Sequence, residues 1–246
     1  MNSMYIKKIA SMVCIAAGCF AAATTYANPY TAQIRSGDKV FQVTDNFSSS
    51  YSLQRTFTSG GKTLYASNLT IEPNAMDIHV VKAHSSQLGR FRVSKGKLDV
   101  FDANGVSLWS EPLKARMCPP EMLGEFVRAH WALLQTNSPA VNCLTPIIKA
   151  KKVAPLKVVR LADLPSGQRV VEFSAGSLGM RFFMTATQLV FSADGNSLLS
   201  HNGQFESSAT IEGTPSFMRG QATYDKPRAI MAMPESLFAA SAQLKQ

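Results

Sequence analysis

The sequence predicts a mainly β protein of the α+β class, in which an antiparallel, strongly curved sheet or half-barrel wraps one long apolar helix. Two observations support this fold class. Most of the chain after residue 28 divides into short runs of aromatic and aliphatic residues between Gly, Ser and Asn clusters, which is typical of strands. A single segment has helical periodicity, and its apolar face is broader than that of an ordinary surface helix.

The strand pattern is clearest in two hairpins. Residues 97–102 and 106–110 flank an Asn-Gly pair, and residues 188–192 and 197–201 flank an Asp-Gly pair. Both pairs supply the positive backbone angles that a tight turn needs. Further strands are expected at residues 39–43, 51–57, 63–69, 153–161, 168–175, 180–185 and 221–224.

The helix is expected over residues 120–135. Pro119 and Pro120 suit a first turn, Glu121 and Glu125 place negative charge near the helix N-terminus, and Asn137 is a plausible stop. At about 100° per residue, one arc covers more than half of the circumference and leaves both glutamates on the remainder. The arc holds Ala129, Met122, Leu133, Phe126, His130, Leu123, Leu134, Val127 and Trp131.

The first 27 residues predict a cleaved secretory signal peptide. Lys7 and Lys8 precede an uncharged apolar run over residues 9–23, and Thr25 and Ala27 are small residues at the positions that a signal peptidase reads. This run is shorter than the roughly 20 residues of a transmembrane helix, and no later stretch is long and apolar enough to span a membrane. A degenerate lipobox offers an alternative, in which Cys19 is lipidated.

The predicted mature protein is one β-rich domain over residues 28–246, located in the periplasm, with a loose C-terminal tail from about residue 229. Removing the leader takes away two lysines and no acidic residue, so the formal net charge falls from +9 to +7. A basic chain is attracted to anionic surfaces such as lipid headgroups or envelope polysaccharide. Nucleic acid is not expected as a partner, because of this location and because no block of like charge forms a binding tail.

The mature chain keeps two cysteines, Cys118 and Cys143, for which an oxidising compartment predicts a disulfide. A helix of sixteen residues rises about 24 Å. Eight extended residues return about 26 Å, which would bring Cys143 back beside Cys118. Metal binding and two free thiols are the weaker alternatives.

No catalytic motif, cofactor motif or metal-ligand cluster stands out in the sequence. His79 and His84 are five residues apart, so neither a strand nor a helix would bring them to one metal ion. No serine lies in a Gly-x-Ser-x-Gly motif, and no unpaired cysteine is left as a nucleophile. We therefore expect no catalytic residues, no metal and no cofactor.

His130 is the one polar residue inside the apolar arc. It is either a core histidine held neutral by a hydrogen bond or a polar contact in a ligand cavity. In the second case the cavity lies between the sheet and the helix and is lined by Met122, Phe126, His130, Trp131 and Leu133. A lysine cluster that includes Lys149, Lys151 and Lys152 would then attract anionic headgroups near the mouth, or would form a solvated strand edge.

The order of elements resembles that of uncharacterised secreted or periplasmic proteins of Gram-negative bacteria. The similarity runs from the hairpin at residue 97 through residues 125–131 to residues 198–203, and it implies no assigned activity. The predicted architecture is also similar in outline to periplasmic lipoprotein carriers, whose open half-barrels hold acyl chains. We therefore expect a soluble periplasmic protein that binds a hydrophobic or amphipathic, lipid-like ligand. The alternative is a non-enzymatic structural or interaction protein of the cell envelope.

Overall fold

The computed structural model describes residues 29–36, 39–49, 51–83, 88–135, 138–148, 151–181, 184–205, 209–211, 214–216 and 219–239. The predicted signal peptide, the alternative lipidation site Cys19 and the predicted ligand contact Lys149 lie outside these residues.

A single large sheet, antiparallel except for the pair of β9 with β10, dominates the protein. Its strands are β1 (Tyr30–Ser36), β2 (Lys39–Ser49), β3 (Ser52–Ser59), β4 (Lys62–Glu72), β5 (Ala75–Lys82), β6 (Gly89–Ser94), β7 (Lys97–Phe101), β8 (Ser107–Pro112), β9 (Arg116–Met117), β10 (Val141–Ile147), β11 (Lys152–Arg160), β12 (Arg169–Ala175), β13 (Thr187–Phe191), β14 (Ser197–Gln204) and β17 (Arg219–Ala229). A separate pair, β15 (Ala209–Ile211) and β16 (Thr214–Ser216), forms a second, two-stranded sheet.

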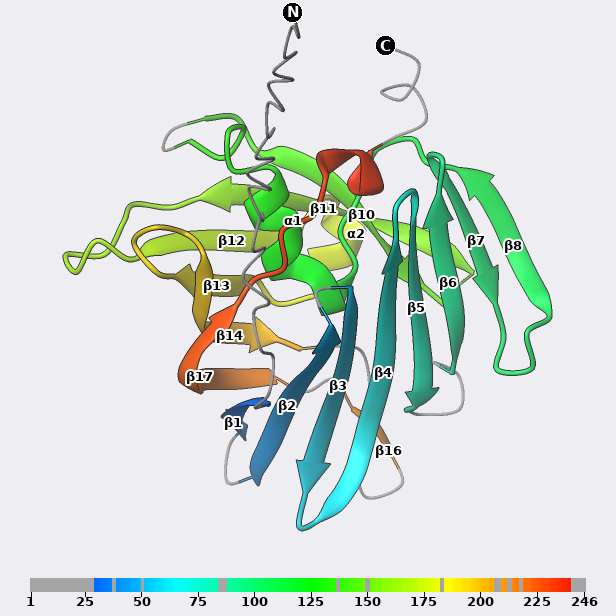
Figure 1. Cartoon of the computed structure of the whole chain (residues 1–246), viewed down its shortest axis with the longest axis horizontal. Coiled ribbons are helices and arrows are strands. Elements are labelled where there is room, and N and C mark those ends of the chain that lie inside the picture. Colours follow the sequence, from blue (N-terminus) through cyan, green and yellow to red (C-terminus); the bar gives the residue numbers. More distant parts are fainter. Residues whose placement is uncertain are drawn as a thin grey trace, which may run out of the picture.

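The large sheet has 15 strands in the order β8-β7-β6-β5-β4-β3-β2-β1-β17-β14-β13-β12-β11-β10-β9. It is not closed, because β8 and β9 form its two edges. In Figure 1, β3 to β8 run across the direction of β11 to β14, and the helix α1 lies where the two halves of the sheet meet. The prediction of a mainly β protein with one large open sheet is therefore confirmed.

Alternation of side chains gives the sheet an inner and an outer face. Buried residues occupy every second position of most strands, as in Phe41, Val43 and Phe47 of β2, and define the inner face. The intervening residues, such as Gln42, are exposed on the outer face. Because strand side chains repeat with a period of two, the register of each strand decides which residues enter the core.

Both predicted hairpins are confirmed. The pair β7 and β8 turns through Gly105, whose φ is 81°, and β13 and β14 turn through Gly195, whose φ is 76°. In each turn an aspartate, Asp102 or Asp194, accepts hydrogen bonds from backbone N–H groups two or more residues ahead. The glycine of each pair thus takes the positive backbone angle that the turn needs, and an Asx hydrogen bond supports the turn.

The strand predicted at residues 180–185 is wrong. The short helix α2 (Leu178–Arg181) is present instead, and the Met184 N–H donates to the Met180 carbonyl at 2.9 Å. This segment connects β12 to β13, which already pair with each other. The segment therefore has no free strand edge to pair with, and its backbone N–H and carbonyl groups bond to each other within a helical turn.

The central helix is shorter than predicted. A 3₁₀ turn over Pro120–Met122 leads into α1 (Leu123–Ala129), so ten residues are helical instead of sixteen. The helix ends at His130, whose ring Nδ1 donates to the Phe126 carbonyl at 2.9 Å. The backbone N–H of His130 still donates to the same carbonyl at 3.1 Å, but the backbone of His130, with φ −107° and ψ 18°, lies outside the helical region, and the helix stops there.

Burial of this helix also differs from the prediction. Met122, Phe126 and Val127 of the apolar arc are buried, but so are Glu121 and Glu125, which the periodicity placed on the polar side. The helix is therefore enclosed on both its apolar and its acidic sides. Enclosing two carboxyl groups requires buried partners for them.

The chain after β17 packs against the helix. We call residues 230–239 the C-terminal strap; it contains a 3₁₀ turn over Glu235–Phe238. Ile230, Met231 and Phe238 are buried, and Phe238 makes an edge contact with Phe126 at 5.5 Å between ring centroids. This part of the predicted loose tail is thus packed, and residues 240–246 lie outside the described residues.

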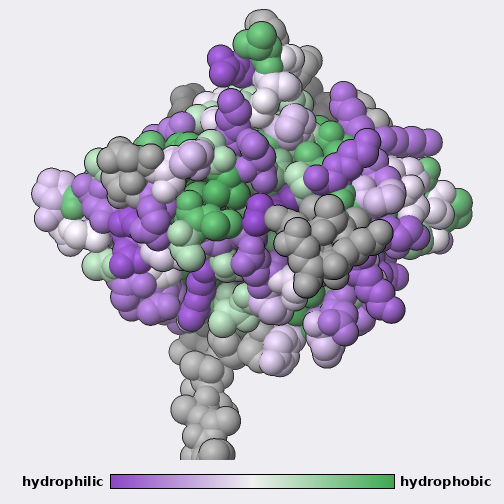
Figure 2. All heavy atoms as spheres, turned by 90° about the horizontal axis from the view of Figure 1, so that it is seen from above, coloured by the Kyte–Doolittle hydropathy of each residue, from purple (hydrophilic) through white to green (hydrophobic). Residues whose placement is uncertain are grey.

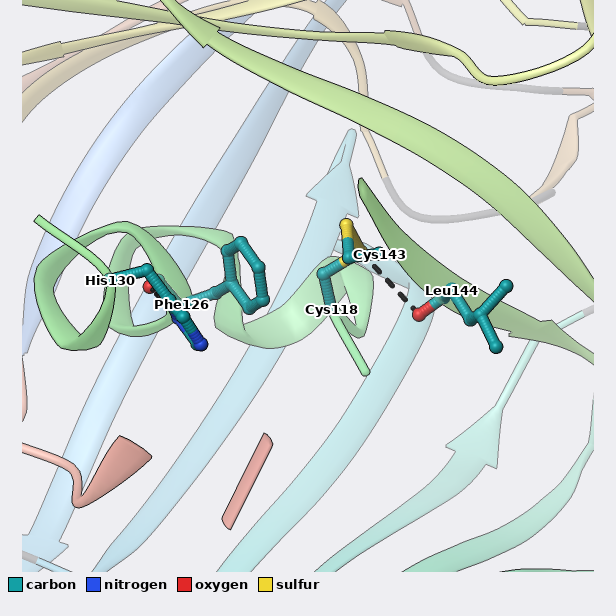
Figure 3. Close-up of a disulfide and its surroundings, with 5 residues drawn as sticks. All are labelled: Cys118, Phe126, His130, Cys143 and Leu144. Atoms are coloured by element: carbon teal, nitrogen blue, oxygen red, sulfur yellow. Dashed lines mark hydrogen bonds between the residues drawn. A yellow bond between two sulfur atoms is a disulfide. The ribbon is translucent and has the colours of Figure 1, made fainter. Parts of the chain in front are cut away.

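The predicted disulfide is confirmed. Cys118 and Cys143 are bonded, with 5.8 Å between their Cα atoms. Cys118 lies directly before the helical segment, and Cys143 lies on β10, which pairs in parallel with β9 (Figure 3). The Cys118 backbone N–H donates to the Leu144 carbonyl at 2.7 Å, so the bond joins the entrance of the helix to the sheet.

Removing this bond should destabilise the fold. We expect the double variant Cys118→Ala/Cys143→Ala to lose about 3 to 4 kcal/mol in free energy of unfolding, because the bond closes a loop of about 26 residues. Urea denaturation of oxidised and variant protein measures this loss, and reductant added to the natural protein should reproduce it. An unchanged midpoint in reductant would contradict the structural role of the bond.

Candidate functional site

The predicted ligand residues divide into a buried group and an exposed group. Met122, Phe126 and His130 lie together in the core. Phe126 stacks on His130 at 4.2 Å (Figure 3). It also contacts Phe173 and Phe238 edge-on at 6.3 and 5.5 Å. Side chains of the protein itself therefore surround the inner face of the helix.

Trp131 and Leu133 lie outside this group. Leu133 is 43% exposed, which corrects the expectation that it lines an enclosed space. Trp131 is partly buried: its ring packs on Phe191, and the guanidinium groups of Arg160 and Arg169 lie 5.1 and 4.8 Å from the ring centroid. The helix ends before both residues, so the arc drawn for a longer helix does not apply to them.

Lys151 and Lys152 are exposed at the turn between β10 and β11. Ile148, on the other side of this turn, is buried and lies against Gly89 of β6. The strand that follows, β11, pairs with both β10 and β12 and is not a sheet edge. The two lysines therefore belong to a hairpin tip, and the alternative in which they protect an edge strand is wrong.

His130 has the features of a neutral core histidine. It is 1% exposed, and burial is the main cause that lowers the pKa of its ring. Because a carbonyl can only accept, Nδ1 carries the proton toward Phe126, and Nε2 presents a lone pair. Among the described residues Nε2 has no hydrogen-bond partner, and it lies 3.7 Å from Oε1 of Glu235, on the C-terminal strap.

A buried ionic network lies between the sheet and the helix. Asp45 of β2 accepts hydrogen bonds from Arg55 of β3 at 2.6 and 2.9 Å, and it also accepts one from Arg228 of β17. Arg228 in turn donates to Glu125 of α1 at 3.1 Å. Asp45 and Glu125 are fully buried, and Arg228 is 1% exposed. The network thus joins three strands to the helix.

Mutual attraction keeps Asp45 and Arg228 ionised. Burial alone would raise the pKa of Asp45, but the charges and hydrogen bonds of Arg55 and Arg228 lower it to about 2. Burial would likewise lower the pKa of Arg228, but Glu125 and Asp45 hold it above its ordinary value. Such a set stabilises the fold only while every member is present, because a lone buried charge is costly.

This network was not predicted, although the sequence contains a signal for part of it. Asp45 follows Phe41 and Val43 in the same two-residue alternation, and Arg55 stands between Leu53 and Phe57 in the next strand. A charged residue in an apolar strand register requires a buried partner, and these two are directly opposite in register. Arg228 and Glu125 carry no comparable local signal.

Two more buried polar groups lie on the inner face. The Tyr65 hydroxyl donates to Oε1 of Glu121 at 2.6 Å. His201 stacks on Phe205 at 3.9 Å, and its Nε2 lies 3.1 Å from the Gln204 carbonyl, to which it donates. Burial is the main cause that lowers the pKa of His201, to about 3.

These groups do not form a recognisable catalytic set. Among the described residues, no cluster of three or more His, Cys, Asp or Glu side chains is placed to hold a metal ion. In the same part of the chain, no helix has the length and apolar character needed to cross a membrane. The buried acids face arginines or tyrosine, an arrangement that favours structural pairing over proton transfer.

A hollow lies on the outer face of the sheet, away from the helix. It measures about 590 Å³ and is bounded by exposed side chains of three neighbouring strands, with Ala32 at its base. We call it the outer groove; its polar lining is Thr31, Gln33 and Arg35 of β1, Gln42 of β2, and Gln221, Thr223 and Asp225 of β17. No pattern in a single strand predicts it, because the lining comes from both ends of the chain.

Comparison with known proteins adds no family or structural relative: no family model, curated protein or solved structure matches the chain.

The buried network predicts that substitutions of two glutamates will differ strongly in their effect on the free energy of unfolding. Glu125→Ala should cost about 3 to 5 kcal/mol in free energy of unfolding, because it leaves Arg228 buried with one partner fewer. The control Glu72→Ala removes an exposed partner of Arg92 and should cost less than about 1 kcal/mol. Urea denaturation of both variants provides the test. Equal losses would show that the network does not stabilise the helix position.

Stability should also fall in mild acid because of His201. Its pKa is about 3 in the folded protein against 6.5 for an unburied histidine, so between these values the unfolded chain binds more protons. The free energy of unfolding should therefore fall as pH drops from 6.5, by up to about 1.4 kcal/mol per pH unit. The His201→Gln variant should show a shallower slope, and the exposed control His79→Gln should not. Matching slopes in all three proteins would contradict this assignment.

Proposed function

We propose that the protein is a non-enzymatic interaction protein of the cell envelope, exported to the periplasm, that binds its partner through the outer face of the sheet. One observation carries the proposal: the inner face is occupied by the helix, the C-terminal strap and their ion pairs, while the outer face is polar and hollowed.

The packing of the inner face argues against a permanent ligand cavity there. Phe126, Phe238 and Met122 fill the region that the lipid hypothesis assigns to a ligand. Opening that region by moving the helix away from the sheet would separate Arg228 from Glu125, and breaking a buried pair costs about 3 to 5 kcal/mol. A bound lipid would have to supply more than this.

The hydropathy and the charge of the protein support a polar partner. Seen from above, the molecule carries mainly hydrophilic side chains, with separate apolar areas between them (Figure 2). The expected net charge of +7 after loss of the leader favours an anionic partner, which the envelope provides as polysaccharide or lipid headgroups.

The C-terminal strap favours a second candidate function. Residues 230–239 belong to no strand, yet Ile230, Met231 and Phe238 are buried against the helix. An acyl chain could replace these side chains if the strap moved away. This keeps the binding of a hydrophobic or amphipathic ligand as the alternative proposal.

Two measurements on the full chain, recovered from the periplasm of a bacterial host, test the proposals. Co-sedimentation with isolated envelope fragments should retain the protein at low salt and release it at high salt, because screening weakens contacts between exposed charges. Native mass spectrometry should give the mass of the protein alone. A co-purified lipid would favour the alternative, and failure to bind envelope material at low salt would contradict the main proposal.

A further inference from the structure

We propose that the outer groove binds an acidic saccharide of about two sugar units, with Arg35 pairing with its carboxylate and the glutamine amides binding its hydroxyls. The proposal rests on the function above, because it names the ligand class of the outer face.

The register of three strands arranges the lining as a grid. Gln33 lies opposite Gln42 on one side and Thr223 on the other, and Arg35 lies opposite Gln221. Neighbouring strands are about 4.8 Å apart, so the row from Gln42 to Thr223 spans about 10 Å. The groove therefore presents polar groups in two dimensions, as a ring with several hydroxyls requires.

The glutamine side-chain amides of this grid form no hydrogen bonds within the described part of the chain. Among the described residues, the side chains of Gln33, Gln42 and Gln221 make no hydrogen bond. Other amides in the sheet are paired across strands: Gln54 donates to Asn68 at 3.3 Å, and Gln188 donates to Glu172 at 3.0 Å. The contrast is informative because Gln33 and Gln42 are directly opposite and remain unpaired.

The two ends of the groove carry opposite charges. Arg35 stands at one end, opposite Gln221, and its side chain likewise has no partner among the described residues. Asp225 stands at the other end, four residues or about 13 Å further along β17. It accepts hydrogen bonds from the Thr31 hydroxyl and N–H at 2.7 and 3.1 Å, which lower its pKa and keep it ionised.

This polarity selects the orientation of a ligand. An arginine fork pairs with a carboxylate through two parallel hydrogen bonds, so the acidic group belongs at the Arg35 end. The Asp225 carboxylate would repel a second anion and accept a hydrogen bond from a hydroxyl. A short saccharide with one acidic sugar and one neutral sugar satisfies both ends.

Other ligand classes fit the groove less well. Ala32 is the one apolar residue among the described lining, so most of the lining residues offer hydrogen-bonding groups that a lipid chain would leave unused. A peptide could not extend the sheet here, because β1 is paired on both sides. The volume of about 590 Å³ lies within the range of sites for small ligands. Without an aromatic ring in the described lining, binding should be weak, in the millimolar range.

Nuclear magnetic resonance of the ¹⁵N-labelled chain tests the proposal, because glutamine NH₂ groups give their own signals. The probe is cellobiouronate, and cellobiose is the neutral control that differs only in having CH₂OH in place of the carboxylate. We expect cellobiouronate to shift the side-chain signals of Gln33, Gln42 and Gln221, and cellobiose to bind roughly tenfold more weakly. The variant Arg35→Gln should abolish this preference, whereas the matched control Arg92→Gln, on the distant strand β6, should retain it.

Three outcomes would overturn the inference. They are an absence of shifts at these glutamines at millimolar probe, equal affinity for the two sugars in the natural protein, and equally strong shifts with inorganic phosphate alone, which would indicate a simple anion site. The backbone spectrum of the Arg35→Gln variant verifies its folding. If the natural chain sediments with envelope fragments but shows no glutamine shifts with the probe, the proposed function stands and this inference fails. If the chain does not sediment with them, the proposed function fails.

Discussion

The position of the helix inside the sheet depends on one buried guanidinium group. Arg228 bonds to Asp45 on β2 and to Glu125 on α1, and it lies over the ring of Phe47 at 5.2 Å. Charges in a low-dielectric interior are tolerated only with well-placed partners, so each member restricts where the others can lie. The helix therefore cannot shift without leaving an arginine or a carboxylate unpaired in the core.

The C-terminal strap follows from the same constraint. Arg128 donates to the Ile230 carbonyl, and the Met231 N–H donates to Glu125 at 3.5 Å, so the strap begins where the ionic network ends. Phe238 then closes the apolar side of the helix. Together with the disulfide at the entrance of the helix, these contacts fasten both sides of a segment that contains only ten helical residues.

In the function that we propose, the binding surface is separate from the groups that stabilise the fold. The inner face holds the groups that would be most costly to disturb, including two histidines whose pKa values are lowered by burial. Side chains on the outer face are exposed, and several of them are unpaired within the described part of the chain. A partner can therefore bind the outer face without opening the core, which is why we assign recognition to it.

Residues that are neighbours in the sequence are sufficient to predict the strand content and both hairpin turns, and the number and spacing of the cysteines predict the pairing of Cys118 with Cys143. The remaining features depend on contacts between distant parts of the chain. Periodicity overestimated the helix because it does not reveal the non-helical backbone of His130, and it placed Glu125 on a polar side because its partner Arg228 is far away in the chain. Asp45 and Arg228 are 183 residues apart, and the outer groove joins β1 to β17 in the same way. Only the closing of β1 against β17 brings such residues together, and no local pattern encodes that register.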